Sequence, residues 1–269
     1  MEHFEKFESY IPVDLMDFRF FLLAIFLVFT IVVFRYFLTA GIFWWMFYRW
    51  QPESLKNRRI YKQLPSNDMQ KYEIRWSMMS SLVFALSAAF LGLMWQAGWT
   101  KFYLKINQYG WFYFFASLFL YSLVHEVYFY WTHRWLHIPA VFKKFHAVHH
   151  QSLTPSPWAS FSFHPVEALI QALALPLIVL VIPIHPVAFL VYLTLMSLSA
   201  VTNHLGFEIL PRRSENNVAR FLISGVHHTM HHKYYRANFG LFYTFCDHLF
   251  KTEHQNFNKD FQHAFEKKS

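Results

Sequence analysis

The sequence predicts an all-α fold: an integral-membrane helical bundle of about three spans plus a helical hairpin, with a cytosolic helical cap that carries clustered histidines. Two observations predict this fold. Hydrophobic residues make up 55% of the 269 residues and charged residues only 15%, against about 25% in ordinary soluble domains. The apolar residues also gather in runs that approach the length of a membrane span, about 20 residues.

Composition excludes several other classes. Only 7 glycines are present, which argues against Gly-rich linkers and collagen-like repeats, and no G-x-G-x-x-G nucleotide motif occurs. Cys246 is the single cysteine, so we expect neither a disulfide framework nor a cysteine-based zinc or iron–sulfur site. The net charge of +8 is also typical of nucleic-acid binders, but the apolar runs favour a membrane protein with basic cytosolic loops. We therefore expect no nucleic-acid partner.

The first span is expected at residues 18–38, an apolar stretch interrupted by Arg35. We expect this guanidinium to extend toward a membrane interface. The loop at 49–75 carries seven Lys or Arg against three Asp or Glu, while the stretch before residue 18 is acidic. The positive-inside rule therefore predicts a cytosolic loop and an N-terminus on the far side of the membrane.

Two further spans and a hairpin follow. Residues 76–99 and 106–124 contain no Asp, Glu, Lys or Arg, which predicts spans at 76–99 and at about 109–130. Two apolar segments of about 15 residues, 168–182 and 187–201, flank a short Pro-containing turn. Each is short for a full span, which predicts a partly inserted helical hairpin.

This topology places the histidine-rich segments in the cytosol, at 133–165 and after residue 203. We expect an N-terminal membrane region at 1–110, a histidine-rich domain at 111–255 and a polar tail at 256–269. The membrane is expected to be a bacterial inner membrane or the endoplasmic reticulum, with the histidines on its cytosolic side.

The 17 histidines are the most informative feature of the sequence. Eight of them form three boxes, one with the spacing H-x3-H and two with the spacing H-x2-H-H. Residues three or four apart on a helix lie on one face, so each box is expected to aim its imidazoles at one place. The boxes consist of His133 and His137, then His146, His149 and His150, then His228, His231 and His232.

Such a set of side chains points to metal. Neutral imidazole binds first-row transition metals at about 2.0–2.1 Å, and about four to six ligands complete a site. Eight imidazoles exceed the need of one ion and suit two. Without metal, the same groups would repel one another as they protonate near pH 6.5. Mere packing is therefore a poor explanation.

His204 and His164 are expected to complete the ligand set, for a total of about ten imidazoles. The hairpin delivers His204 to the cytosolic membrane surface, and His164 precedes the hairpin in a Phe-His-Pro sequence. Either one can instead support a ligand through a hydrogen bond. That supporting role is expected of His125, His227 and Asn238. No carboxylate lies inside any box, so we expect no catalytic residue beyond the metal ligands.

These motifs resemble the fatty acid hydroxylase/sterol desaturase superfamily of integral-membrane di-iron oxygenases. The similarity covers roughly residues 117–252. Three sequences are similar to the family's histidine boxes: YWTHRWLH at 130–137, HAVHH at 146–150, and HHTMHH at 227–232 followed by NFG at 238–240.

Two further stretches resemble the sterol C5-desaturase branch: residues 154–167 with Gln171 beyond them, and the doubled histidine at 227–228. The sequence departs from the family pattern at three places. Glu126 stands where an Asp is common, and Cys246 and Lys251 stand where Trp and Gly are frequent.

The resemblance implies that residues 111–255 are a catalytic domain with a di-iron centre, two iron ions held by the histidines. It implies dioxygen as co-substrate and a lipid, sterol-like or fatty acyl, that is hydroxylated or desaturated. The electrons are expected from an external donor protein of the cytochrome b5 or ferredoxin kind, because no flavin or nicotinamide motif is present. The hairpin before His204 is expected to line the lipid channel.

Two alternatives stay open on the residues alone. A histidine-rich metal transporter or sensor is the first, although transport sites lie near the bilayer midplane on broken helices and these boxes are expected outside the spans. A zinc hydrolase is the second, but it needs a general base such as the Glu of H-E-x-x-H, which no box contains. The pattern does not separate a desaturase from a hydroxylase, because the two can differ only in how the substrate lies.

Overall fold

The computed structural model describes residues 13–56, 58–61, 63–211, 218–258 and 261. Regular structure in these residues is helical and is accompanied by isolated β-bridges, such as the one between Arg59 and Phe207. The prediction of an all-α fold is therefore confirmed. Most of the acidic N-terminal stretch and most of the tail at 256–269 lie outside the described residues.

Four helices in the described part of the chain are long and apolar enough to cross a membrane. Apolar runs of this length form helices because a helix satisfies all of its backbone groups internally, without water. The four are α1 (Phe18–Trp44), which continues as a π-helical turn at Trp45–Trp50, α3 (Asn67–Gln96), α4 (Gly110–Leu136) and α8 (Pro186–Asn203).

The predicted hairpin consists of α7 (Pro165–Val181) and α8, and α8 is longer than expected. Each helix starts at a proline, whose fixed φ suits the first helical position, and each is capped by the preceding histidine. Nδ1 of His164 accepts a bond from the Val166 amide at 3.2 Å. The starts add residues to both helices, and α8 also ends two residues later than expected, at Asn203, so it reaches 18 residues and becomes a candidate span in its own right.

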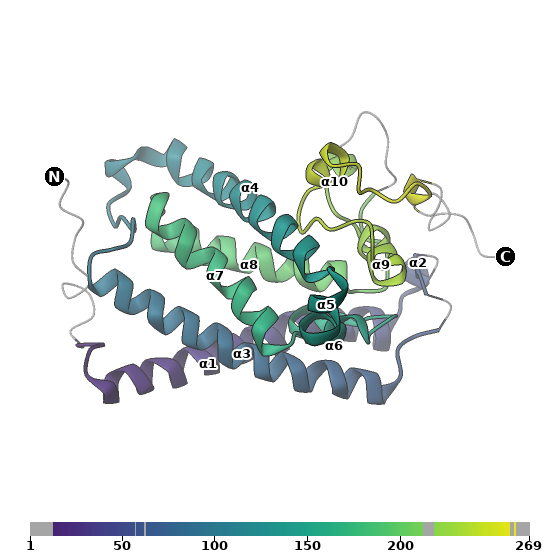
Figure 1. Cartoon of the computed structure of the whole chain (residues 1–269), viewed down its shortest axis with the longest axis horizontal. Coiled ribbons are helices and arrows are strands. Elements are labelled where there is room, and N and C mark those ends of the chain that lie inside the picture. The colour runs from purple at the N-terminus through teal and green to yellow at the C-terminus, as the bar shows by residue number, and fades with distance from the viewer. Residues whose placement is uncertain (1–12, 57, 62, 212–217, 259–260, 262–269) are drawn as a thin grey trace.

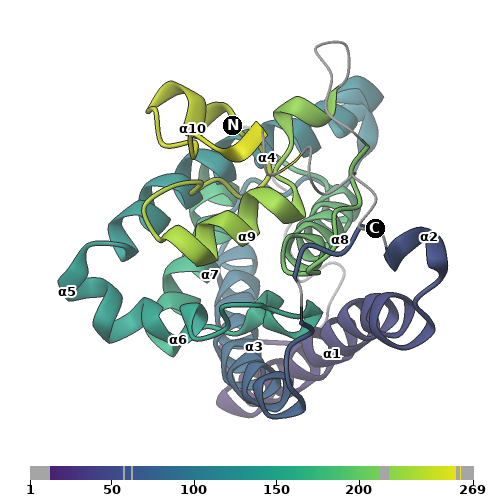
Figure 2. The same ribbon diagram turned by 90° about the vertical axis from the view of Figure 1, so that its right-hand side faces the viewer.

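Figure 1 shows α1, α3, α4, α7 and α8 running roughly along one axis, with the short helices gathered at one end. In Figure 2, α9 lies across this end and α6 lies below it, in front of the bundle helices. The short helices are α2 (Glu53–Lys56), α5 (Pro139–Val141), α6 (Ala147–His150), α9 (Gly225–Tyr234) and α10 (Phe245–Leu249). Together they correspond to the helical cap that the sequence predicts around the histidine boxes.

The outside of the bundle carries many exposed apolar side chains. Tyr121, Phe189 and Val179 are buried where α4, α7 and α8 meet. In contrast, only 6% of the apolar window of α1 is buried, and Phe26 of α1 and Phe112 of α4 are exposed. An outward apolar surface of this extent suits hydrocarbon, not water.

Arg35 does not extend toward a membrane interface, which corrects our expectation. Its Nη2 donates to the carbonyl oxygen of Leu193 at 2.9 Å and to Oγ of Ser197 at 3.1 Å, both in the middle of α8. The reason is the packing of α1 against α8, which places Arg35 on the inward face of α1.

Candidate metal centre

Nine histidines form two groups at the capped end of the bundle. Within each group, the possible ligand nitrogens all lie within 4.8 Å of one another. They come from the end of α4, from α6 and the π-helical turn before it, from the residue after α8, and from α9. The larger group holds His133, His137, His146, His150 and His231, and the smaller group holds His149, His204, His228 and His232.

Each H-x2-H-H box is divided between the two groups, which corrects the expectation that a box aims at one place. His146 and His150 face the larger group, whereas His149 faces the smaller one, and His231 of the third box joins the larger group. At 3.6 residues per turn, side chains four apart diverge by about 40° in one direction and those three apart by about 60° in the other. A single box can therefore serve two neighbouring metal ions.

The Nε2 atoms of the larger group are spaced like ligands of one ion. Nε2 of His146 lies 3.0 Å from Nε2 of His137 and 3.1 Å from Nε2 of His150. Nε2 of His231 lies 3.1 Å from the same atom of both His137 and His150. Two nitrogens bound to one ion at about 2.1 Å and at right angles are about 3.0 Å apart. The spacing therefore fits adjacent positions of an octahedron.

The smaller group shows the same spacing. Nε2 of His204 lies 3.2 Å from Nε2 of His149 and 2.9 Å from Nε2 of His228. Nε2 of His232 lies 3.1 Å from Nε2 of His228. The two groups thus have equivalent geometry, with five and four imidazoles respectively.

Backbone carbonyls fix the orientation of four of these rings. In each case Nδ1 of the ring donates to a carbonyl oxygen. The pairs are His133 to Phe239 (2.9 Å), His231 to Ala237 (2.8 Å), His204 to Ala200 (2.7 Å) and His149 to Ser162 (3.2 Å). A carbonyl only accepts, so each Nδ1 carries the proton and each Nε2 presents a lone pair. Lone pairs that face one another at about 3 Å repel unless a cation lies between them, so the residues present fit a bound metal ion in each group.

A carboxylate fixes a fifth ring. Nδ1 of His146 donates to Oε1 of Glu167 at 2.8 Å, and both side chains are buried. A carboxylate in this position makes the imidazole a stronger metal ligand. Sequence reasoning placed Glu167 in a stretch typical of the family but gave it no role. No local spacing links it to a box, because 21 residues separate the partners.

Two buried carboxylates hold the loop that supplies the carbonyls of Ala237 and Phe239. Glu126 accepts bonds from the amides of residues 241, 242 and 243. Asp247 accepts bonds from the amides of Phe239 and Gly240, each at 2.9 Å. Through this loop, the two carboxyl groups help to fix the rings of His133 and His231.

The three residues expected to support the ligands lie outside both groups. Asn238 binds the loop ends together, since its Nδ2 donates to the His227 carbonyl and its Oδ1 accepts from the His254 amide. The His227 ring lies 3.7 Å from Asp247 and packs on Phe257. His125 lies deeper in the bundle, where Nδ1 is 2.7 Å from the Tyr192 hydroxyl.

The structure does not bring His164 into either group. Its Nδ1 is engaged in capping α7, and its ring packs beside Trp76 and Phe145, with ring centroids 6.1 and 5.4 Å away. The proline that follows it explains this position, because a residue before proline at a helix start takes the extended cap conformation. Nine of the ten expected ligands therefore converge.

Burial keeps the grouped imidazoles neutral. Desolvation, followed by repulsion from neighbouring imidazoles, holds the pKa of His146, His150 and His231 well below its usual range. The same causes lower the pKa of His137 to about 2. In the smaller group, desolvation and neighbouring imidazoles likewise hold the pKa of His149, His228 and His232 well below its usual range. Neutral imidazole is the form that binds metal, so both groups are ready to bind metal at pH 7.

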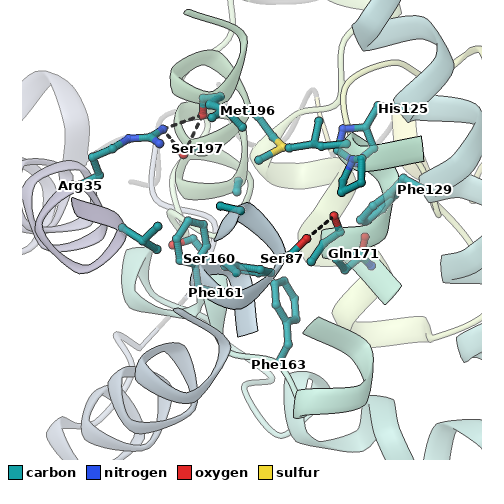
Figure 3. Close-up of a pocket in the computed structure, with 18 of the residues that line it drawn as sticks. Arg35, Ser87, His125, Phe129, Ser160, Phe161, Phe163, Gln171, Met196 and Ser197 are labelled. Atoms are coloured by element: carbon teal, nitrogen blue, oxygen red, sulfur yellow. Dashed lines mark hydrogen bonds between the residues drawn. The ribbon is translucent and has the colours of Figure 1, made fainter. Parts of the chain in front are cut away.

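An apolar cavity of about 180 Å³ adjoins the two groups, between α1, α3, α4, α7 and α8 (Figure 3). Three of the residues that line the cavity contact grouped histidines. The ring of Phe129 lies 5.0 Å from that of His133, the ring of Phe163 lies 4.9 Å from that of His149, and Ala200 is the partner of His204. Polar side chains on its walls are few and include His125, Gln171 and Arg35. The cavity therefore lies beside both groups, although none of the nine grouped histidines lines it.

Comparison with known proteins agrees with this geometry. The family model described as fatty acid hydroxylase matches residues 118–252, which include all nine grouped histidines. No solved structure gives a significant match.

The curated relatives include Delta(7)-sterol 5(6)-desaturases and lathosterol oxidases. A Delta(7)-sterol 5(6)-desaturase of Gibberella zeae is 31% identical over 150 residues, 56% of this chain and 45% of that protein. Lathosterol oxidase of Mus musculus is 30% identical over 180 residues, 66% of this chain and 58% of that protein. A Delta(7)-sterol 5(6)-desaturase of Saccharomyces cerevisiae is 36% identical over 120 residues, 45% of this chain and 31% of that protein. The aligned part of the chain thus spans between 31% and 58% of the length of these relatives.

Proposed function

We propose, since this chain belongs to the fatty acid hydroxylase family, that it is a membrane-bound di-iron oxygenase that hydroxylates or desaturates a C–H bond of a lipid, with dioxygen as oxidant. One observation carries the proposal: two histidine groups with Nε2 spacings of 2.9–3.2 Å lie beside an apolar cavity. The names of the relatives favour a sterol-like lipid, and a fatty acyl lipid is the other candidate.

We assign metal ligation to the nine grouped histidines, five for one ion and four for the other. Bound there, two iron ions would supply the oxidising power that no side chain possesses. The carbonyl oxygens and Glu167 orient the imidazoles. Phe129 and Phe163 line the cavity, contact His133 and His149, and exclude water from this side of the histidines. Whether the product is an alcohol or an alkene then depends on how the lipid lies in the cavity.

The domain division at 110 and 111 separates parts that act together. We place the catalytic domain at 111–255, yet α1 and α3 of the region 1–110 supply cavity residues such as Val32, Phe84 and Leu91. The N-terminal region is therefore part of the substrate site as well as a membrane anchor.

We also infer an external electron donor, of the cytochrome b5 or ferredoxin kind, that reaches the capped end from the cytosol. The protein is a multi-pass membrane protein with four candidate spans. The relatives favour the endoplasmic reticulum, and a bacterial inner membrane is the alternative.

The alternative of a metal transporter or sensor has less support. A transport site is expected near the bilayer midplane on broken helices. The two groups instead lie at one end of the bundle, where the cap meets the ends of α4 and α8 (Figure 1).

Metal analysis joined to lipid analysis tests the proposal. The purified full chain is expected to retain about two iron ions, and cells that express it are expected to contain a lipid with one added oxygen or one added double bond. His228→Ala should abolish that product, whereas His248→Ala should not, because His248 pairs with Glu253 outside both groups. A readily exchanged metal with no change in any lipid would favour the transporter.

A further inference from the structure

Arg35 is a charged side chain in the wall of the mostly apolar cavity. It lies in α1, a candidate membrane span, and its Nη2 donates to the Leu193 carbonyl and to Oγ of Ser197. Both acceptors are uncharged. A guanidinium has five N–H donors, so these two bonds leave most of its donor capacity for another partner.

No acidic partner neutralises this charge within the described residues. No carboxylate of those residues lies within ion-pair distance of Arg35, and the other polar side chains of the cavity are serines, Gln171 and His125. A cation in a membrane span is costly unless it is paired or faces a water-filled or ligand-filled cavity. An anion that enters the cavity would therefore find a charge that no described carboxylate neutralises.

The position of Arg35 indicates where in the cavity an anion would bind. Figure 3 shows Arg35 reaching in from one side of the cavity, whereas His125 and Phe129 lie on the opposite side. Ser197, which holds the guanidinium, precedes His204 by seven residues along α8 and the turn after it. At 1.5 Å per residue this is about 10 Å, which separates the charge from the metal ligands by several methylene groups or much of a ring system.

We propose that Arg35 binds the acidic head group, a carboxylate or a phosphate, of the lipid that occupies this cavity. The apolar remainder of the lipid then lies toward Phe129 and Phe163, beside the histidines. Guanidinium binds both anions through paired, charge-assisted hydrogen bonds, which a neutral hydroxyl cannot match. This inference rests on the proposed function in one respect, that the occupant of the cavity is the substrate.

Photo-crosslinking tests the head-group preference without turnover. The probe is a palmitic acid analogue with a diazirine in its chain, added to the full chain in lipid nanodiscs, and the labelled residues are mapped by mass spectrometry. We expect labels on cavity residues of α3 and α8, such as Phe84 and Leu193. Palmitic acid or lysophosphatidic acid should displace the probe at concentrations at least about tenfold lower than 1-hexadecanol or cholesterol. The better of the two acids identifies the head group.

Variants assign the preference to Arg35. Arg35→Gln should abolish the advantage of the acids, and Arg35→Lys should retain part of it because the charge remains. Arg19→Gln is the matched control, since Arg19 lies in the same helix but is exposed and paired with Asp17. It should leave the preference unchanged.

Two results would overturn the inference. In the wild-type protein, 1-hexadecanol or cholesterol could compete as well as the acids, or a folded Arg35→Gln variant could keep the acid preference. The wild-type comparison decides the matter even if Arg35→Gln fails to fold. Because labelling requires neither metal nor turnover, the absence of an acid preference in a wild-type protein that oxidises a lipid refutes this inference alone and leaves the proposed function standing.

Discussion

Glu167 and His146 form a buried carboxylate–imidazole pair at the edge of the larger histidine group. Glu167→Gln keeps an oxygen that can accept from Nδ1 of His146 but removes the negative charge that strengthens Nε2 as a ligand. We expect metal affinity to fall about 10–100-fold. The measurement is the iron content of purified protein across a chelator series.

Glu253→Gln is the control for this change, because Glu253 accepts from His248 outside both groups. It should retain iron as the wild type does. Equal retention by the Glu167→Gln protein would show that the carboxylate positions the ring without tuning it.

His204 and His164 were expected as equivalent additions to the ligand set, and the structure separates them. His204→Ala removes one of the four imidazoles of the smaller group, so we expect less iron per chain and no product. His164→Ala removes only the cap of α7 and should retain iron, while its unfolding free energy falls by about 1 kcal/mol.

Iron content and thermal unfolding of the two variants, compared side by side, check this prediction. If His164→Ala lost iron as His204→Ala does, the exclusion of His164 from the metal ligands would be wrong.

At the scale of elements, the loop at 237–243 contacts both α9 and α4 and so connects the histidines that these two helices supply. Its amides are held by Glu126 of α4 and by Asp247 of α10, and its carbonyls hold the rings of His231 and His133. The loop passes so close to these groups that only glycine fits at Gly240. A Cβ atom there would lie 2.6 Å from the Tyr243 carbonyl oxygen and 3.0 Å from Oε1 of Glu126.

Gly240→Ala should therefore displace the loop and loosen both rings. We expect a loss of about 1–3 kcal/mol in unfolding free energy, because the Cβ overpacks a rigid site, together with reduced iron content. Gly41→Ala is the matched control, since its Cβ would meet Trp158 at an ordinary contact distance of 3.5 Å within a helix. Thermal unfolding and iron analysis of both variants decide the matter, and equal behaviour would contradict the steric argument.

At the scale of the whole molecule, the basic loop after α1 and the histidine cap lie at the same end of the bundle (Figures 1 and 2). The connection between α3 and α4 lies at the opposite end (Figure 1). A membrane across the four candidate spans would separate these two ends. The positive-inside rule then predicts that the histidine end faces the cytosol.

Cysteine labelling tests this orientation in a Cys246→Ser background. Lys71→Cys and Gln255→Cys should react with an impermeant reagent only from the cytosolic side, and Asn107→Cys only from the other side. All three side chains are exposed. The reverse pattern would invert the topology, and labelling of Lys71→Cys and Gln255→Cys from different sides would contradict the arrangement of the bundle.

The sequence by itself determined three of the four candidate spans and the histidine boxes. Both signals are local. A span is a property of about 20 consecutive residues, and a box is a property of residues three or four apart, such as His146 and His149. Helix starts were less predictable. α3 begins at Asn67 and not near residue 76, because Ser66 caps a polar first turn that the apolar run does not include.

Only the tertiary structure decided which imidazole joins which group and what orients it. The division of His149 from His150, the exclusion of His164 and the anchoring by Glu167 depend on how separate helices meet. The carbonyl partners are backbone groups that every residue possesses, so no side-chain pattern can mark them. Arg35 is similar: the sequence shows a charge within a span, but the packing of α1 on α8 turns it into the cavity.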